Sequence, residues 1–526
     1  MNRIARALAV TAFLAAAPLF SQSFGKTTTL QMPEGQAVTG SISVDVDRDG
    51  LTDLVIPTHV KGKKFARTAR IYLRHAGAAP FRAEPDFVVE FPADVCAFAV
   101  GDVHADPGWE IVMITSQTAY AWRPKAADAD RVVKLAPVSF LWQAPGPENT
   151  LPWMSATDDL NGDGLEDLFI PEPTGYRVVH QLRKDGVASF GTPNFIRFPA
   201  DDSLVATADL GVVRGSSGGR LSIRLSDSEA DEGPLVEIEE STPALIRADV
   251  DGDGDIDLLG QSAERLYVWT QSPGQGFTEK PAFTWDLPVI ADQRRRLDVS
   301  YVSLLEDLDG DKKADNVIVA GDQRSSEVRT QILVFVQGKP GPGTTFDAAS
   351  PLYGKSGVPA QLLVIAGFAG DPALDDIDND GLPDLIVGSL RVDTLDALRA
   401  AGSDAIDADV YVYKNRGGTF SPRPDLSWRV ALKVEGLRRG RRDLQAKFVG
   451  DVTGDGIAEL LVRDTPEHAA LYMVRRQKDA LAVIEKPLWE TTVSSGARIL
   501  REWSGPKGAT EFVVLEGTQL FHVRFQ

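Results

Sequence analysis

Carboxylates recur at fixed spacing in one stretch near the middle of the chain, Asp249-Val-Asp-Gly-Asp-Gly-Asp-Ile-Asp257. Aspartates occupy positions 1, 3, 5 and 9 of this stretch, and Gly254 occupies position 6. Calcium takes about six to eight oxygen ligands, and a tight turn presents alternate side chains inward to supply them. Glycine permits the left-handed backbone that such a turn needs, and the carbonyl of Asp255 would add a backbone oxygen. The spacing therefore predicts a calcium-binding loop.

The same pattern is repeated along the chain. Similar loops begin at Asp45 (DVDRDGLTD), Asp159 (DLNGDGLED), Asp307 (DLDGDKKAD), Asp376 (DIDNDGLPD) and Asp451 (DVTGDGIAE), and a weaker relative begins at Asp102 (DVHADPGWE). A short apolar run follows every loop, which predicts a β-strand. An EF-hand would instead need a glutamate at position 12 and flanking helices. Position 12 is apolar or glycine in all six, which excludes that class: Ile56, Ile170, Gly260, Ile318, Val387 and Val462.

The spacing of the loops predicts the fold class. Loops begin at residues 45, 102 and 159, intervals of 57 residues, and the interval from 249 to 307 is 58. Such an interval has room for four short strands and their turns, and radially arrayed four-stranded antiparallel sheets are the blades of a β-propeller. We therefore expect an all-β fold, a β-propeller. Segment 27–31 is expected to pair with the C-terminal strands and close the ring. Eight blades result if 204–240 is an insertion, nine if it is a blade, and seven if one unit is absorbed elsewhere; we favour eight.

The N-terminus has the features of a secretory signal. Arg3 and Arg6 precede an apolar stretch, residues 7–20, that is too short to span a bilayer. We expect a signal peptide at 1–23 and a single propeller at 24–526, with no integral membrane segment after cleavage and a secreted or periplasmic location. The alternative is an uncleaved membrane anchor.

The composition limits which interactions can stabilise the fold and which partners the protein can bind. Cys96 is the only cysteine, so an internal disulfide is excluded, and we expect bound calcium to stabilise the fold instead. The net charge is −20, which argues against nonspecific binding to nucleic acid. Many of the acids lie in the loops, where each bound calcium ion would cancel two charges.

Together these features resemble the FG-GAP/VCBS repeat family, whose best-known members are the propellers of integrin α subunits. The motif is D-x-[DN]-x-D-G-x-x-D followed by an apolar strand, and the resemblance covers residues 40–526. It implies that each loop joins the first two strands of a blade and binds a structural calcium ion at the rim of one face. It implies about five to six calcium sites. Their side-chain ligands would be Asp45, Asp47, Asp49 and Asp53; Asp159, Asn161, Asp163 and Asp167; Asp249, Asp251, Asp253 and Asp257; Asp307, Asp309, Asp311 and Asp315; Asp376, Asp378, Asp380 and Asp384; and Asp451, Asp455 and Glu459.

Some loops depart from the family's pattern. Lys312 replaces the position-6 glycine, and a non-glycine residue in the left-handed conformation costs about 1 kcal/mol. Thr453 replaces a carboxylate in the Asp451 loop. The Asp102 member has His104 where an oxygen is needed and Pro107 where the turn needs glycine, so no calcium is expected there.

No catalytic constellation stands out in the sequence. The six histidines are scattered, and there is no Gly-x-Ser-x-Gly elbow, phosphate loop or dinucleotide fingerprint. Two arginine clusters, Arg294–Arg296 and Arg438 to Arg442, each precede a loop by about a dozen residues and are expected on the opposite face. Arginine binds carboxylated or sulfated glycans in a bidentate manner, although such clusters often only pair with neighbouring acids or face solvent.

Three functions are compatible with this sequence. The leading hypothesis is an exported, calcium-stabilised propeller that acts as a binding or interaction module for an unidentified protein or glycan ligand. The alternatives are an extracellular carbohydrate-active enzyme, such as a polysaccharide lyase, and a purely structural cell-surface component. Fold analogy cannot choose among them.

Overall fold

The structure of the chain is a computed structural model. It describes residues 26–75, 81–105, 108–124, 126–142, 151–184, 187–199, 218–224, 235–241, 245–261, 265–271, 276–286, 299–322, 329–339, 352–353, 357–390, 405–433, 445–465, 468–478, 480–492, 498–504, 510–516 and 519–524. The expected signal peptide, 1–23, and both arginine clusters lie outside these residues. Within them, no helix is long and apolar enough to cross a membrane.

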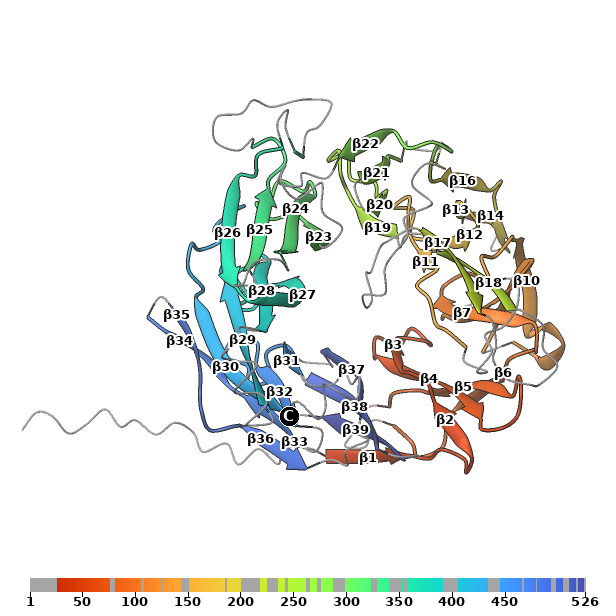
Figure 1. Ribbon diagram of the computed structural model, residues 1–526. Helices are drawn as coiled ribbons and strands as arrows, with labels where there is room; N and C mark the ends of the chain where they lie inside the picture. The colour runs from red at the N-terminus through yellow and green to blue at the C-terminus, as the bar shows by residue number, and fades with distance from the viewer. Residues whose placement is uncertain are drawn as a thin grey trace, which may run out of the picture.

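The described residues form antiparallel sheets arranged in a ring (Figure 1). Seven of these sheets have four strands and one has five. We call these eight sheets blades 1 to 8. The prediction of an all-β propeller with antiparallel blades is confirmed, and the count is compatible with the eight blades that the sequence favoured.

The first four blades follow one another in chain order. Blade 1 contains β2 (Gln36–Val38), β3 (Ile42–Val44), β4 (Asp53–Val60), β5 (Arg67–Tyr72) and β6 (Phe87–Glu90). Blade 2 contains β7 (Val95–Gly101), β8 (Glu110–Thr115), β9 (Thr118–Trp122) and β10 (Val132–Pro137), with the 3-10 helix η1 (Asp128–Asp130) before its last strand. Blade 3 contains β11 (Thr157–Asp158), β12 (Asp167–Glu172), β13 (Gly175–Val179) and β16 (Asn194–Arg197). Blade 4 contains β19 (Leu245–Ala248), β20 (Asp257–Gln261), β21 (Arg265–Trp269) and β22 (Phe283–Asp286).

The second half of the chain repeats this order. Blade 5 contains β23 (Val299–Glu306), β24 (Asp315–Asp322), β25 (Arg329–Phe335) and β26 (Gln361–Ala366). Blade 6 contains β27 (Phe368–Asp375), β28 (Asp384–Leu390), β29 (Ala405–Tyr413) and β30 (Leu426–Lys433). Blade 7 contains β31 (Gln445–Phe448), β32 (Leu460–Thr465), β33 (His468–Tyr472) and β36 (Trp489–Thr492). Blade 8 contains β37 (Arg498–Ser504), β38 (Thr510–Glu516), β39 (Gln519–Arg524) and β1 (Lys26–Leu30).

Three hairpins are separate from the blades. β14 (Gln181–Lys184) pairs with β15 (Val187–Phe190), and β34 (Val474–Gln477) pairs with β35 (Ala480–Val483). β17 (Gly218–Arg224) pairs with β18 (Leu235–Ser241) to form a two-stranded sheet that comes between blades 3 and 4 in the sequence. The described part of 204–240 is therefore one two-stranded hairpin and not a four-stranded blade, which agrees with the insertion alternative. Residues 204–217 and 225–234 lie outside the described part.

The hydrophobic core lies between the blades because second strands are buried on both faces, as blades 4 and 5 show. Successive side chains of a strand point to opposite faces. In blade 4, Leu258 belongs to a cluster shared with blade 3, whereas Leu259 belongs to a cluster shared with blade 5. In blade 5, Val317 packs towards blade 6 and Ile318 towards blade 4. This explains why the run after each loop is continuously apolar and does not alternate with polar residues.

The first strand of the ring completes the last blade. β1 pairs antiparallel with β39, with Leu30 opposite Leu520. Both leucines are buried in a cluster with Leu54 and Ile56 of blade 1. The same strand thus contributes hydrogen bonds to blade 8 and apolar packing to blade 1.

Truncation of Leu30 tests this closure. We expect Leu30→Ala to lower the free energy of unfolding by about 2–5 kcal/mol, because it leaves a cavity at a side chain that is 1% exposed. Thr29→Ala is the matched control, since Thr29 is exposed on the same strand. Denaturant unfolding measures both. Equal effects of the two substitutions would show that β1 does not pack into the ring.

Candidate metal centres

Six acidic loops lie at equivalent places in six blades, each joining the first strand to the second. We name them after their blades: the loops of blade 1 (45–53), blade 3 (159–167), blade 4 (249–257), blade 5 (307–315), blade 6 (376–384) and blade 7 (451–459). This placement agrees with the one that the sequence resemblance implied.

The carboxylate at position 9 holds the turn in place in the loops of blades 1, 3, 4, 5 and 7. In blade 4, Asp257 is fully buried, and its Oδ2 accepts the Val250 N–H at 2.9 Å while its Oδ1 accepts the Gln271 N–H at 2.9 Å. The first bond fixes the start of the loop, and the second fixes the chain just after the third strand. The loops of blades 1, 3 and 5 show the same two bonds. In blade 7, Glu459 accepts the Val452 N–H at 2.6 Å.

The carboxylates at positions 1 and 5 stabilise the turn itself. Asp249 accepts the N–H groups of Gly252 at 2.6 Å and Gly254 at 3.0 Å, and Asp253 accepts the Asp255 N–H at 2.9 Å. Position 6 has a left-handed backbone, with φ of +95° at Gly254. Lys312 takes the same conformation in blade 5, with φ of +70°, as its position in the motif predicted.

Five loops bring three acidic side chains together, with one oxygen of each within 4.8 Å of the others. These sets are Asp45, Asp47 and Asp53; Asp249, Asp251 and Asp257; Asp307, Asp309 and Asp311; Asp376, Asp378 and Asp384; and Asp451, Asp455 and Glu459. Of the carboxylates expected as ligands in these loops, Asp49, Asp253, Asp315 and Asp380 are outside the sets, and the loop of blade 3 contributes none. Each set can hold a metal ion; the assignment of individual ligands stays a prediction.

The oxygen donors of these sets fit a hard cation such as calcium. In blade 6, Asp378 Oδ1 and Asp384 Oδ2 are buried without a hydrogen-bond partner. Buried acceptors without partners are costly, and a cation would satisfy them. Burial, with a smaller contribution from neighbouring carboxylates, raises the pKa of Asp53, Asp257, Asp315, Asp384 and Glu459 to about 7. Metal binding requires the deprotonated form, so it would be accompanied by proton release.

In the loops of blades 2 and 3, basic side chains of the protein contact an acid of the loop. Asp102, in the weaker loop of blade 2, is 1% exposed and pairs with Arg48 and Arg183, the latter at 3.2 Å. These guanidinium groups supply positive charge where the sequence predicted no calcium. In blade 3, His180 Nδ1 lies 2.9 Å from Asp167 Oδ2.

A set of amide side chains links each of four blades to the loop of the blade before it. Gln271 is buried, and its Nε2 donates to the Leu160 carbonyl in the loop of blade 3 at 2.7 Å. Gln181, Gln337 and Asn415 make the corresponding bonds to the loops of blades 2, 4 and 5. The acidic motif does not predict these residues. The available signal was a glutamine or asparagine two positions after each of four third strands.

Backbone bonds also join neighbouring loops. The Ala314 N–H donates to the Asp249 carbonyl at 2.8 Å, and the Ala458 N–H donates to the Ile377 carbonyl at 2.8 Å. The loops of blades 4 and 5, and those of blades 6 and 7, are thus in direct contact. A metal ion in one loop would therefore stabilise two blades.

Removal of one expected ligand tests the metal assignment in blade 4. We expect Asp251→Asn to reduce the bound calcium by one ion and to shrink the calcium-dependent gain in thermal midpoint, because ions that bind only the folded state stabilise it by mass action. Asp255→Asn is the matched control, because only the backbone carbonyl of this residue is expected to face the ion. A midpoint in wild type that a chelator leaves unchanged would contradict structural calcium in all loops.

Removal of one amide tests the link between blades. We expect Gln271→Leu to lower the free energy of unfolding by about 1–3 kcal/mol, because the Leu160 carbonyl loses a buried donor. Gln477→Leu, at an exposed position of β34, is the control and should change it little. Urea unfolding with calcium present measures both; a loss no larger than in the control would show that the amide bond does not contribute.

Comparison with known proteins adds little to this picture. No protein-family model matches the chain, and no curated protein sequence is significantly similar to it. Similar solved structures include a lectin from Agrocybe aegerita that recognises non-reducing terminal N-acetylglucosamine (14% identity, TM-score 0.38, covering 88% of this chain and 93% of that one). They also include the exotype rhamnogalacturonan lyase YesX (12% identity, TM-score 0.40, covering 94% of this chain and 75% of that one). A third is Sqt1 from Chaetomium thermophilum (11% identity, TM-score 0.39, covering 93% of this chain and 100% of that one). At these identities and TM-scores the similarities carry no argument about function.

Proposed function

We propose that this protein is an exported β-propeller, stabilised by calcium, that binds a protein or glycan ligand. One observation carries the proposal: the acidic loops are used to hold the ring together. Their position-9 carboxylates accept backbone N–H groups within each blade, and amide side chains tie several loops to the next blade. Calcium in such loops would have a structural role and would leave other surfaces for recognition.

The face opposite the loops is the favoured recognition surface. Trp142 is 44% exposed there and packs edge-to-face against Phe140, with 5.4 Å between ring centroids. Its place follows from two bonds: the Leu141 N–H donates to the Pro171 carbonyl, and the Phe140 N–H donates to the Ser116 carbonyl. Pro171 and Ser116 both lie at the ends of second strands far from the loops. An exposed indole combines a flat apolar surface with a hydrogen-bond donor, which suits a sugar ring or a protein side chain.

Two arginine clusters in the sequence support an acidic glycan as the ligand. The arginine clusters at 294–296 and 438–442 would favour carboxylated or sulfated glycans. A protein partner without acidic groups would not need them.

Binding to a panel of neutral and acidic polysaccharides tests the proposal. We expect the calcium-loaded protein to be retained on an acidic glycan without cleaving it. Retention should weaken by about tenfold in Trp142→Ala, which corresponds to a loss of about 1.4 kcal/mol of binding free energy, and should also weaken when the arginines are neutralised. Phe283→Ala, an exposed aromatic on the outer strand of blade 4, is the control.

Each other outcome has a defined meaning. New chain ends on the polysaccharide would favour the carbohydrate-active enzyme. Retention that is equal in wild type and in Trp142→Ala would exclude Trp142 from the binding surface. No retention on any glycan, followed by failure to capture a protein partner, would contradict a binding function.

A further inference from the structure

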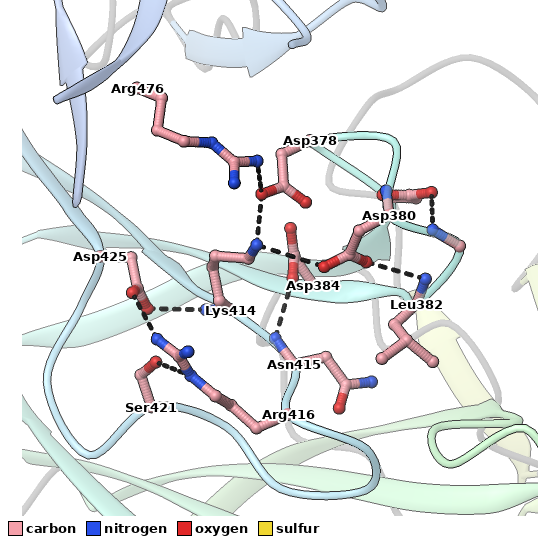
Figure 2. Close-up of polar contacts among 12 residues, drawn as sticks. Asp378, Asp380, Leu382, Asp384, Lys414, Asn415, Arg416, Ser421, Asp425 and Arg476 are labelled. Carbon is pink, nitrogen blue, oxygen red and sulfur yellow. Dashed lines mark hydrogen bonds and ion pairs between the residues drawn. The ribbon is translucent and has the colours of Figure 1, made fainter. Parts of the chain in front are cut away.

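Two cationic side chains reach the acidic loop of blade 6. Lys414 directly follows β29, and its Nζ forms an ion pair with Asp378 at position 3 of the loop and lies 3.2 Å from Asp380 Oδ2 at position 5 (Figure 2). Arg476, on β34, forms a second ion pair with Asp378. These contacts involve carboxylates of the loop that the sequence predicts to bind calcium.

The position of Lys414 is fixed by its surroundings. Its own N–H donates to Asp425 Oδ2 at 2.9 Å, and the N–H of the next residue, Asn415, donates to Asp384 Oδ1 at 2.8 Å. The Lys414 side chain is 15% exposed, and the Asp378 side chain is fully buried. Because the chain is held on both sides, the ammonium group is directed into the loop (Figure 2). Ion pairs of this kind are much less screened by water than surface pairs are.

The charges of this arrangement match those of a bound ion. The loop has four carboxylates, Asp376, Asp378, Asp380 and Asp384, with a formal charge of −4. Lys414 and Arg476 together supply +2, which is the charge of one calcium ion. The blade 6 loop therefore has the same net charge with these two side chains as it would have with calcium alone.

The other loops differ in this respect. For the acids of the blade 4 and blade 7 loops, the described residues contain no ion pair with a lysine or arginine. In blade 5, Lys339 pairs with Asp309, but the Lys339 side chain is 60% exposed, against 15% for Lys414. Among the loops of blades 4 to 7, as far as the structure describes them, only that of blade 6 has a largely buried lysine in contact with two of the expected ligands.

We propose that Lys414 is a built-in counter-cation of the blade 6 loop, which keeps this loop folded without calcium and competes with calcium for it. The proposal rests on the proposed function only in that it takes the other loops to bind calcium. An ion entering blade 6 must displace the ammonium from Asp378 and Asp380. Asp378 Oδ1 and Asp384 Oδ2 have no hydrogen-bond partner and could act as ligands, so calcium is disfavoured there and not excluded.

Hydrogen exchange on wild-type protein is the first test. When a chelator removes calcium, we expect peptides that cover 249–257 and 451–459 to lose protection and the peptide that covers 376–384 to keep it. Loss of protection in the blade 6 loop equal to that in the blade 4 loop would overturn the proposal. This test needs no variant and is read out even if the protein has no ligand.

Substitution of the lysine is the second test. We expect Lys414→Gln to bind one more calcium ion than wild type at micromolar free calcium, counted by native mass spectrometry, with at least a tenfold gain in affinity at that loop. It should also make protection of 376–384 depend on calcium. Lys134→Gln, at an exposed position of β10, is the control.

The outcomes separate this proposal from the proposed function. An unchanged ion count and unchanged exchange in Lys414→Gln would overturn the role of Lys414. A wild-type protein that binds no calcium in any loop would contradict the calcium-stabilised propeller, while protection of 376–384 would still decide whether Lys414 holds its loop. If Lys414→Gln does not fold, exchange in wild type alone decides.

Discussion

A buried carboxylate that accepts two backbone N–H groups is the interaction on which the ring depends. Asp257 shows it most simply: one oxygen holds the start of its loop and the other holds the chain after the third strand. The second strand begins at this same residue, so a single side chain sets the position of three consecutive parts of a blade. Burial makes the carboxylate costly to ionise, which links the geometry of the blade to the cation that its loop can hold.

The blades are not independent units, because the core lies between them. A second strand whose alternate residues belong to two different clusters cannot bury its apolar surface alone. The amide of Gln271 and the Ala314–Asp249 backbone bond add polar links in the same direction, from each blade to the one before it. Stability is therefore shared between neighbours, as in other repeat proteins. Calcium in one loop would stabilise more than one blade.

The features that are local in sequence could be predicted, and those that bring distant residues together could not. The acidic loops, the apolar strands after them and the left-handed position at Lys312 follow from spacing alone. Gln271 and Leu160 are 111 residues apart, and Arg476 and Asp378 are 98 apart. The connections between strands vary in length from blade to blade, so no fixed spacing connects such pairs. The ion pair of Lys414 with Asp378 likewise could not be predicted from the motif of the blade 6 loop.

The pairing of β1 with β39 has a consequence for the order of synthesis. The first strand of the ring to be made has the last strand as its partner. During translation β1 must remain unpaired, or pair wrongly, until the rest of the propeller has emerged. A chain cut short before β39 would keep an open sheet edge, which favours aggregation. The ring can therefore close only after the whole chain between these two strands has been made.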